Sequence, residues 1–335
     1  MILLKVRLYR IVMNKSDQKM AKQTLKILIA NPRGFCAGVQ RAIQIVEVAL
    51  KKYGVPVYVR HEIVHNKFVV DTLKNKGAIF VDELNQVPEE APVIFSAHGV
   101  PKSVPLEAER RKLLYVDATC PLVSKVHREA EQHNKNNNHV IMIGHEGHPE
   151  VIGTLGQVPE GKITLVESIE DVKDLNVPTN KGLAFLTQTT LSIDDTKDII
   201  KALQAKYPDI SSPKKEDICY ATTNRQEAAK EITKRSDKLI VIGATNSSNS
   251  LRLVEVATRQ NIPAKLLQRA TDIEWEWLQG TKTLGITAGA SAPEVLVEEV
   301  LDALKNKFNV NVEIITTREE DVTFKLPPIL LKEVV

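Results

Sequence analysis

The sequence predicts an α/β fold of three similar small domains, each built on a mostly parallel sheet. Short apolar runs, which are typical of buried strands, alternate with stretches of about a dozen residues that have helical apolar spacing. Three cysteines, Cys36, Cys120 and Cys219, are 84 and 99 residues apart, and each separation is about the length of one small domain. We therefore expect one cysteine in each domain, with all three facing a common centre.

The first predicted domain covers residues 24–120. Its opening apolar run ends at the turn residues Asn31 and Pro32, which indicates a buried strand. Apolar residues then recur at helical spacing until Gly54, a usual helix C-terminal signal. The predicted elements, in order, are a strand at 25–30, a helix at 39–53, a strand at 55–60, a helix at 67–76 and a strand at 93–99.

Residues 121–218 and 219–315 are predicted to repeat this plan as the second and third domains. Pro121 fits the first position of a helix, which places Cys120 at or near the N-cap. The helix dipole favours a thiolate there, so we expect Cys120 to ionise more easily than an ordinary cysteine. Two further helix starts are predicted by capping boxes: Ser192 with Asp195, and Ser291 with Glu294.

Two terminal segments lie outside these domains. Residues 1–23 are basic, with Asp17 as the single acid, and Lys5 interrupts their apolar run, so they fit a secretory signal poorly. We expect a disordered extension, or an upstream start codon with Met20 as the true start. Residues 316–335 contain two adjacent prolines, and we expect them to form a C-terminal tail that crosses another domain.

Composition excludes several classes of function. The 335 residues include 45 Lys and Arg against 42 Asp and Glu, a balance that indicates binding neither to nucleic acid nor to a membrane surface. No apolar stretch approaches the ~20 residues that span a bilayer. Aromatic residues make up 4%, too few for a platform that stacks single strands. Three cysteines without a CxxC pair indicate a reducing compartment, and we expect a cytoplasmic protein.

Polar residues follow the predicted strands. Five strands end at Ser96, Gly144, Thr187, Gly243 and Thr287, and each runs into His, Ser, Thr or Asn. Ligands of open α/β sheets bind outside the carboxyl ends of the strands, where the N–H groups of the next helix favour an anion. If the three domains face one another, these strand ends line one cavity.

The cysteines have two interpretations. Any one of them is most simply a small buried hydrophobe. Together, at three strand-to-helix junctions, they indicate a metal centre. Three thiolates could bind zinc with a water molecule, or an iron–sulfur cluster in which one iron lacks a protein ligand, and their spacing does not choose between the two.

The histidines fall into two groups. The histidines at the ends of predicted elements suit an anion site: His65, His98, His145 and His148. The histidines in polar helix or loop contexts are expected to be solvated: His127, His133 and His139. Hydroxyl and amide side chains that ordinarily cap helices add further anion ligands: Thr189, Thr190, Ser247, Ser248, Asn249 and Ser291. Glu150 ordinarily would complement a helix dipole, but beside a histidine in a cavity it could donate protons with a raised pKa.

Nine motifs occur in order along the chain: GFCAGV, VRHEIVHN, FSAHGV, DATCPLV, IGHEGHPEV, LTQTTLS, DICYATTNRQ, ATNSSNS and TAGASAPE. Together they resemble the motifs of the 4-hydroxy-3-methylbut-2-enyl diphosphate reductases of the methylerythritol phosphate isoprenoid pathway. The resemblance covers about residues 24–325 and leaves out residues 1–23.

The resemblance implies a trefoil of three α/β domains around a central cluster and substrate cavity. It implies one 4Fe-4S cluster held by Cys36, Cys120 and Cys219, with an open iron that takes the substrate hydroxyl. It also implies a set of diphosphate ligands: His65, His98, His148, Ser247, Ser248, Asn249 and Ser291. Thr189 would orient the hydroxyl, Glu150 would deliver protons, and ferredoxin or flavodoxin would supply electrons.

The implied reaction is reductive dehydroxylation of 4-hydroxy-3-methylbut-2-enyl diphosphate to isopentenyl and dimethylallyl diphosphate. Loss of an allylic hydroxyl as water needs two electrons and two protons, so the site must combine a redox centre, a Lewis acid and a proton donor. Few lysines or arginines accompany the strand ends, so we expect substrate affinity to fall as the histidines deprotonate. Two alternatives remain: a zinc-dependent hydrolase of a phosphorylated small molecule, and a protein that binds phosphometabolites.

Overall fold

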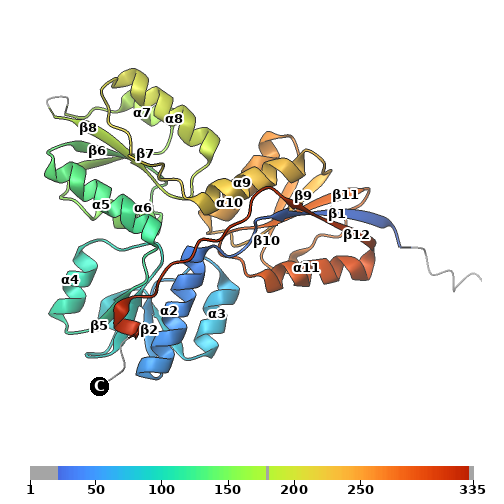
Figure 1. Ribbon diagram of the computed structural model, residues 1–335, viewed down its shortest axis with the longest axis horizontal. Coiled ribbons are helices and arrows are strands. Elements are labelled where there is room, and N and C mark those ends of the chain that lie inside the picture. The colour runs from blue at the N-terminus through green and yellow to red at the C-terminus, as the bar shows by residue number, and fades with distance from the viewer. Residues whose placement is uncertain (1–21, 179–180, 332–335) are drawn as a thin grey trace, which may run out of the picture.

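Three small α/β units surround a common centre (Figure 1). The structure is a computed structural model and describes residues 22–178 and 181–331. Each unit has its own sheet, with four, three and five strands, and all the strand pairs run parallel. The predicted α/β class with three parallel-sheet units is therefore confirmed.

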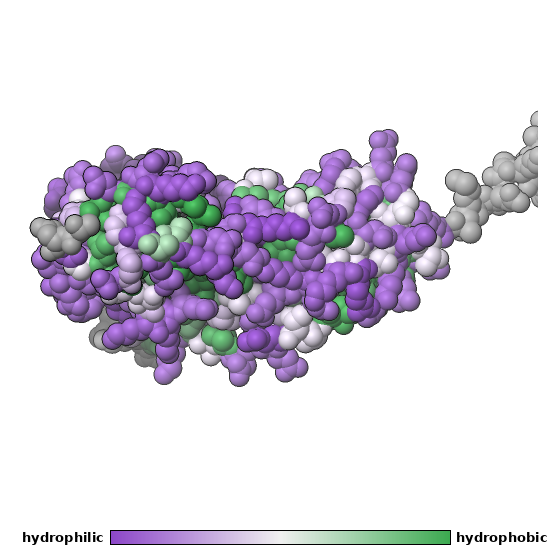
Figure 2. Space-filling view, turned by 90° about the horizontal axis from the view of Figure 1, so that it is seen from above, coloured by the Kyte–Doolittle hydropathy of each residue, from purple (hydrophilic) through white to green (hydrophobic). Residues whose placement is uncertain are grey.

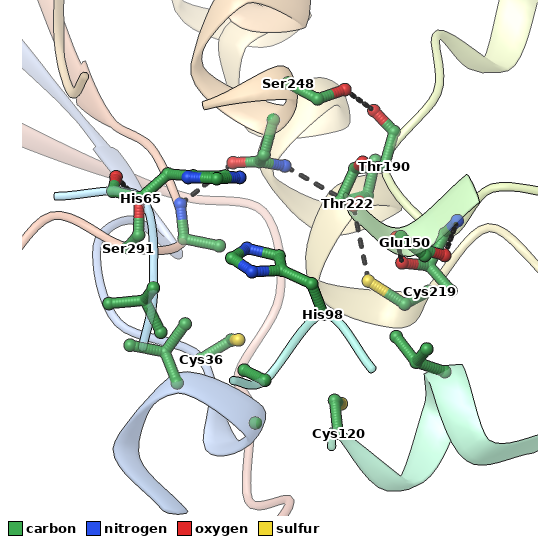
Figure 3. Close-up of a pocket in the computed structure, with 18 of the residues that line it drawn as sticks. Cys36, His65, His98, Cys120, Glu150, Thr190, Cys219, Thr222, Ser248 and Ser291 are labelled. Atoms are coloured by element: carbon green, nitrogen blue, oxygen red, sulfur yellow. Dashed lines mark hydrogen bonds between the residues drawn. The ribbon is translucent and has the colours of Figure 1, made fainter. Parts of the chain in front are cut away.

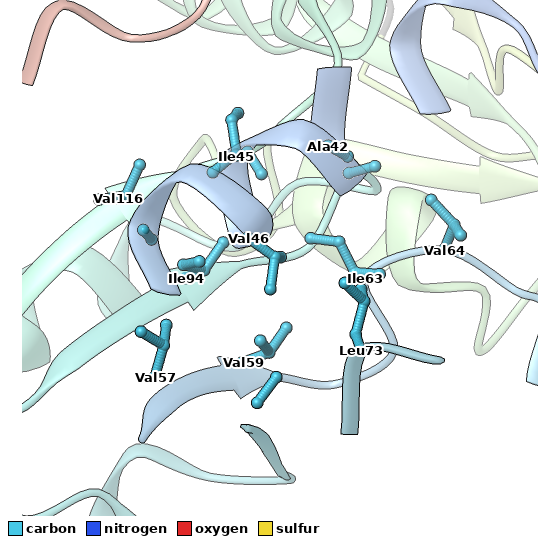
Figure 4. Close-up of a cluster of buried hydrophobic side chains, with 14 of the residues drawn as sticks. Ala42, Ile45, Val46, Val57, Val59, Ile63, Val64, Leu73, Ile94 and Val116 are labelled. Carbon is cyan, nitrogen blue, oxygen red and sulfur yellow. The ribbon is translucent and has the colours of Figure 1, made fainter. Parts of the chain in front are cut away.

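The first unit has a sheet of order β3-β2-β4-β5. Its strands are β2 (Val57–Arg60), β3 (Ala78–Val81), β4 (Pro92–Phe95) and β5 (Leu114–Asp117). Its helices are α2 (Ala37–Tyr53), α3 (Lys67–Asn75), α4 (Ser103–Arg110) and the 3-10 turn η1 (Leu84–Gln86). Ile45 and Val46 of α2 pack with Val57, Val59 and Ile94 in one buried cluster (Figure 4). Side chains alternate across a strand, so Val93 and Phe95 face α4 on the other side.

The second unit has a sheet of order β7-β6-β8. Its strands are β6 (His139–Ile143), β7 (Ile163–Val166) and β8 (Leu183–Thr187). Its helices are α5 (Pro121–Lys135), α6 (Pro149–Leu155), α7 (Ile169–Asp174) and α8 (Ile193–Lys206). Every residue of β6 and β8 is buried. Helices cover both faces of this sheet, which explains the continuous apolar runs in the sequence.

The third unit has a sheet of order β10-β9-β11-β1-β12. Its strands are β1 (Thr24–Asn31), β9 (Lys238–Ile242), β10 (Ala264–Leu267), β11 (Thr283–Ala288) and β12 (Asn309–Thr316). Its helices are α9 (Tyr220–Thr233), α10 (Ser248–Arg259), α11 (Glu294–Lys307) and the 3-10 turn η2 (Ala270–Asp272). Helices α9 and α10 cover one face of the sheet, and α11 covers the other.

The position of β1 differs from the sequence prediction, which placed this strand in the first domain. It lies between β11 and β12, with Leu28 opposite Gly285, so its hydrogen-bonded neighbours belong to the third unit. Leu25, Ile27 and Ala30 are fully buried, as expected for an inner strand. Apolar periodicity indicates that a strand is buried on both faces, but it does not identify the strands that pair with it.

The C-terminal tail leaves β12 and crosses from the third unit to the first, as predicted (Figure 1). Arg41 of α2 donates from Nε to the carbonyl of Lys325 at 2.9 Å. Leu326 and Leu330 pack against the buried cluster around α2, and the short helix α12 (Pro328–Leu331) ends the described chain. The tail therefore fastens the third unit to the first.

The predicted N-terminal extension lies outside the described residues, apart from Lys22 and Gln23. The carbonyl of Gln23 accepts a hydrogen bond from Asn309 N at 2.9 Å, so pairing with β12 begins just before β1. In the part of the chain that the structure describes, no helix has the length and apolar character that crossing a membrane requires. The face seen in Figure 2 is mainly hydrophilic, with scattered hydrophobic residues.

Candidate active site

One cavity lies where the three units meet (Figure 3). Every residue that the resemblance implies for the cofactor, the substrate or proton transfer lines it, whereas His145, also predicted to suit the anion site, does not. The implied residues are Cys36, His65, His98, Cys120, His148, Glu150, Thr189, Cys219, Ser247, Ser248, Asn249 and Ser291. The strand ends that the sequence indicated therefore converge, although they come from three sheets.

Each cysteine is the N-cap residue of a helix: Cys36 of α2, Cys120 of α5 and Cys219 of α9. None of the three is in a disulfide. Each backbone N–H donates to a carbonyl at a strand end, which fixes the position of the helix start. The acceptors are Ala290 for Cys36, Ala97 for Cys120 and Thr189 for Cys219, at 3.3, 2.9 and 3.0 Å.

The three thiol groups surround one space beside His98 (Figure 3). A Cβ atom built on Gly38 would lie 2.7 Å from the Sγ of Cys120 and 3.8 Å from the Sγ of Cys36. The absence of a side chain at Gly38 therefore leaves room for both sulfur atoms. Thr222, one turn into α9, bonds the Sγ of Cys219 through its hydroxyl at 3.3 Å.

The thiols of Cys120 and Cys219 are harder to ionise than those of ordinary cysteines. The pKa of Cys120 is raised to about 12, mainly by burial and to a lesser extent by the charges of Cys36 and Cys219, although N–H groups at the start of α5 lower it. Burial likewise raises the pKa of Cys219 to about 11. The expectation that Cys120 ionises easily is wrong for the metal-free protein, because loss of hydration outweighs the helix dipole.

Three histidines form one wall of the cavity. The rings of His65 and His98 stack with centroids 4.0 Å apart, and His148 meets them edge-on at 5.8 and 5.9 Å. Burial, with the two neighbouring rings, holds the pKa of His98 well below its usual range. Burial also lowers the pKa of His148 to about 3. Both are therefore neutral in mildly acidic buffer, so the deprotonation of these two histidines cannot cause the predicted fall in affinity in the free protein.

Neutral His148 has a defined tautomer. Its Nδ1 accepts a hydrogen bond from Glu150 N at 3.2 Å, so its proton is on Nε2. The Nδ1 of His65 lies 3.0 Å from the Oε2 of Glu62, and the buried Nε2 of His65 has no hydrogen-bond partner. The Nε2 atoms of His65 and His148 are therefore the ring nitrogens that are available to an anion.

The other histidines lie away from the cavity wall. His145 lies 3.7 Å from the carboxylate of Glu167. His139 is buried and shares a hydrogen bond of 2.8 Å with Thr164, so its expected solvated position is wrong. His139 is the first residue of β6 and is buried with the rest of the strand. In the sequence it is only a polar residue before an apolar run, so its burial was not evident.

Glu150 is the buried acid of the site. It lies in the first turn of α6 and is 2% exposed. Thr189 donates to it twice, from N to Oε1 at 2.7 Å and from Oγ1 to Oε2 at 2.9 Å. Burial raises the pKa of Glu150 to about 7, although the two Thr189 bonds lower it and the charge of Asp217 raises it slightly. The carboxyl group can therefore hold or release a proton near neutral pH.

The start of α10 supplies the polar groups on the far side of the cavity. Ser247 is its N-cap and accepts from Ser250 N at 3.4 Å. Ser248 donates to the carbonyl of Thr190 in the second unit at 3.1 Å. Asn249 Oδ1 accepts from Ala290 N at 2.8 Å. Free N–H groups at a helix start, with hydroxyls beside them, form a site for an anion.

Comparisons with known proteins show the family to which the chain belongs. The model of a family described as LytB protein matches residues 27–305. The chain belongs to the LytB protein family. Proteins called 4-hydroxy-3-methylbut-2-enyl diphosphate reductase are similar to it. The one from Ruegeria pomeroyi is 61% identical over 93% of this chain and 99% of that protein. The one from Hyphomonas neptunium is 60% identical over 92% of this chain and 98% of that protein.

Solved LytB structures share the fold. The E-1-hydroxy-2-methyl-but-2-enyl-4-diphosphate reductase of Plasmodium falciparum has a TM-score of 0.88 and 41% identity, with 93% of this chain and 97% of that chain covered. A second structure, described as (E)-4-hydroxy-3-methyl-but-2-enyl diphosphate reductase, the terminal enzyme of the non-mevalonate pathway, has a TM-score of 0.62 and 33% identity. It covers 84% of this chain and 99% of its own.

One local prediction for this LytB chain is wrong. Helix α11 begins at Glu294 after Pro293, and no side chain caps it, so Ser291 and Glu294 do not form a capping box. The hydroxyl of Ser291 instead donates to the carbonyl of His65 at 2.9 Å, which joins the third unit to the first. The other predicted start is correct in part, because Ser192 accepts from Asp195 N at 3.3 Å.

Two residues of the LytB cavity were missed by sequence reasoning. Gly38 leaves space beside two sulfur atoms, and Thr222 contacts both Cys219 and the Nδ2 of Asn249, the latter at 3.4 Å. Each lies within one helical turn of a cysteine, in the GFCAGV and DICYATTNRQ motifs. That proximity was the available signal.

Proposed function

We propose that this chain converts 4-hydroxy-3-methylbut-2-enyl diphosphate to isopentenyl diphosphate and dimethylallyl diphosphate, at the last step of the non-mevalonate isoprenoid pathway. Its LytB membership and its similarity to reductases over nearly their whole length support the proposal. The observation that carries it is the meeting of three thiols, a buried acid and an anion-binding helix start in one cavity.

Cys36, Cys120 and Cys219 would hold one 4Fe-4S cluster. When bound, the cluster would supply single-electron transfer and an open iron that acts as a Lewis acid. The thiols line one cavity and fit the cluster, because the raised pKa values of Cys120 and Cys219 reflect burial without a neighbouring cation, which a metal centre would supply. Among residues 22–178 and 181–331, no three His, Cys, Asp or Glu side chains are placed to hold a single metal ion, so a zinc site is the poorer fit.

The diphosphate would lie against the start of α10. Ser247, Ser248 and Asn249 bring hydroxyl, amide and backbone donors, and Ser291 brings a hydroxyl from the next strand end. His65, His98 and His148 face them across the cavity. No lysine or arginine of the described chain lines this cavity. Recognition would therefore depend on oriented neutral donors, and a bound anion would raise the pKa of the histidines that it contacts.

Glu150 and Thr189 would manage the protons. Cleavage of the C–O bond takes up two electrons and two protons, of which one leaves with the hydroxyl as water and one remains on the allyl product. A carboxyl group whose pKa is about 7 can release a proton at neutral pH. The Thr189 hydroxyl, 2.9 Å from Glu150 Oε2, would orient the leaving hydroxyl beside that acid.

The electron donor would be a ferredoxin or a flavodoxin, because the reaction needs a carrier of single electrons at low potential. A reducing compartment such as the cytoplasm suits three free thiols.

The test is turnover by protein purified without oxygen and assayed with a reduced viologen dye. Brown protein that contains iron and sulfide, and that forms both products, would support the proposal. Mössbauer spectra with and without substrate would show whether one iron binds it. Colourless, zinc-loaded protein that hydrolyses the diphosphate would refute it. Glu150→Gln should abolish most turnover. If the wild type binds the substrate but does not turn it over, and Glu150→Gln binds it equally well, the chain would instead be a binding protein.

A further inference from the structure

Arg225 is the largest side chain that is completely buried in the described chain. It lies in α9, six residues after Cys219, and does not line the cavity. A guanidinium group has five N–H donors in a fixed planar arrangement. Each of its three nitrogens donates to at least one acceptor, and the acceptors come from three separate parts of the chain.

Two of these parts carry cysteines. Arg225 donates from Nε and Nη2 to the carbonyl of Gly34 at 3.0 and 2.8 Å, and from Nη2 to that of Phe35 at 3.3 Å. These two residues directly precede Cys36. Its Nη1 donates to the carbonyl of Ala221, at the start of α9, at 3.0 Å. Arg225 therefore joins the loop that carries Cys36 to the helix start that carries Cys219.

The third part is the C-terminal tail. Both carboxylate oxygens of Glu320 bind Arg225, at 3.0 and 3.3 Å, and the amide of Asn224 donates to Glu320 at 2.8 Å. A buried charge without a partner is strongly destabilising, so Glu320 is what allows a guanidinium group in this position. The tail thus supplies the counter-charge for a contact between two cysteine segments.

A second arginine repeats the pattern toward the remaining cysteine. Arg41 of α2 donates from Nη1 to the carbonyls of Ala118 and Thr119, at 3.3 and 3.1 Å, and these two residues directly precede Cys120. Its Nε binds the tail at the carbonyl of Lys325. The tail crosses between α9 and α2 in Figure 1. Arg225 of α9 binds it at Glu320, and Arg41 of α2 binds it at Lys325. The segments before Cys36 and Cys120, and the one after Cys219, are therefore held by two arginines that share one tail.

We propose that Arg225 is a positioning residue for the sulfur centre and that Glu320 is its charge partner. The inference rests on the proposed function, because it assumes that the three thiols hold a cluster. Arg225 holds the Cys36 loop at a fixed distance from Cys219 through planar, two-point contacts that a lysine cannot reproduce. The tail is thereby part of the construction of the cluster site.

This role differs from simple structural support in its electrostatics. The guanidinium group of Arg225 binds the carbonyl of Phe35, the residue directly before Cys36. Glu320→Gln removes the compensating negative charge and keeps the shape of the side chain. The unbalanced positive charge should favour the reduced cluster and raise its midpoint potential. A contact that served only to hold the fold together would not shift the potential in a defined direction.

The experiment compares Arg225→Lys, Glu320→Gln and a control, Arg318→Gln, with the wild type. Arg318 also joins the tail to α9, through an exposed ion pair with Glu227 at 3.9 Å, but among the residues that the structure describes it forms no hydrogen bond or ion pair with a cysteine segment. Metal-free proteins are treated with iodoacetamide without denaturant, and the alkylation of each cysteine is followed by peptide mass spectrometry. Reconstituted proteins are assayed for iron and sulfide, for cluster lifetime in air, and for midpoint potential by EPR-monitored titration.

Iodoacetamide should alkylate Cys36 about tenfold faster in Arg225→Lys than in the wild type, because the variant loses charge-assisted bonds to the carbonyls of Gly34 and Phe35. Its cluster should also decay about tenfold faster in air. Glu320→Gln should raise the midpoint potential, while Arg318→Gln should match the wild type in all measurements. If Arg225→Lys fails to fold, the potential of Glu320→Gln still decides the matter.

Two failures can be told apart. If the wild type holds its cluster, and the two variants match it in alkylation, lifetime and potential, the positioning role is refuted and the proposed function stands. If the wild type binds no iron and sulfide, the proposed function fails, and the inference fails with it.

Discussion

Glu150→Gln should change how the stability of the protein depends on pH. The pKa of Glu150 is raised from 4.5 to about 7, mainly by burial. Because the folded-state pKa lies above the unfolded-state value, the unfolded protein releases this proton first as the pH rises. The stability that Glu150 contributes is therefore fully present below pH 4.5 and is lost as the pH rises through about 7.

The expected size follows from the two pKa values. One pKa unit corresponds to about 1.4 kcal/mol, so Glu150 alone should lower the free energy of unfolding by about 3 kcal/mol across this range. Glutamine has nearly the same shape and can still accept the bond from Thr189 N, but it does not titrate. The free energy of unfolding of the variant should therefore increase by about 3 kcal/mol relative to that of the wild type between about pH 5 and pH 8.

Urea denaturation of both metal-free proteins at several pH values measures this difference. Groups common to both proteins, such as His98 and His148, cancel in the comparison. Glu170→Gln is the matched control, because the side chain of Glu170 is 75% exposed and its loss removes one negative charge from the surface. We expect that control to follow the wild type at every pH.

Two results would contradict the reasoning. A difference between Glu150→Gln and the wild type that stays constant with pH would mean that Glu150 titrates alike in the folded and unfolded states. A difference that falls with pH would mean that the Thr189 bonds outweigh burial and stabilise the carboxylate. In both cases Glu150 would be ionised at neutral pH in the free protein and could not serve as its proton donor.

Three further outcomes are expected. Wild-type kcat should fall as the pH rises above about 7, because ionised Glu150 cannot donate a proton, and a flat profile would contradict this. Gly38→Ala should lower bound iron several-fold, since its Cβ would lie 2.7 Å from a cysteine sulfur, whereas Gly285→Ala, equally crowded at 2.8 Å but remote from the thiols, should lose only stability. Lys125→Met should cost about 3 kcal/mol in urea denaturation by leaving buried Asp217 unpaired, and a loss near zero would show that the ion pair contributes little.

The sequence predicted the strand ends and the cysteine positions well, because both depend on local signals. An apolar run that stops at Gly or a polar residue marks a strand end wherever that strand is placed. Pro121 marked the start of α5 and so placed Cys120 at the N-cap. Since parallel sheets gather their carboxyl ends at one edge, local signals also sufficed to predict a shared cavity.

Properties that depend on the whole fold were not predictable in this way. The helix dipole at Cys120 is a local effect, and it favoured a low pKa. The burial that raises that pKa arises from the meeting of three units, which no local pattern records. Ser291 shows the same limit, because its spacing to Glu294 fits a capping box, while its actual partner is the carbonyl of His65 in another unit.

The wrong sheet predicted for β1 and the geometry of the site have one common cause. The chain leaves the sheet of the third unit at Asn31 and enters α2 of the first unit only after Cys36. Cys36 therefore lies in a crossing between units, where its N–H binds Ala290 and the carbonyls before it bind Arg225, both in the third unit. If β1 belonged to the first sheet, this crossing would not exist. The long-range pairing of β1 is thus what brings Cys36 to the other two thiols.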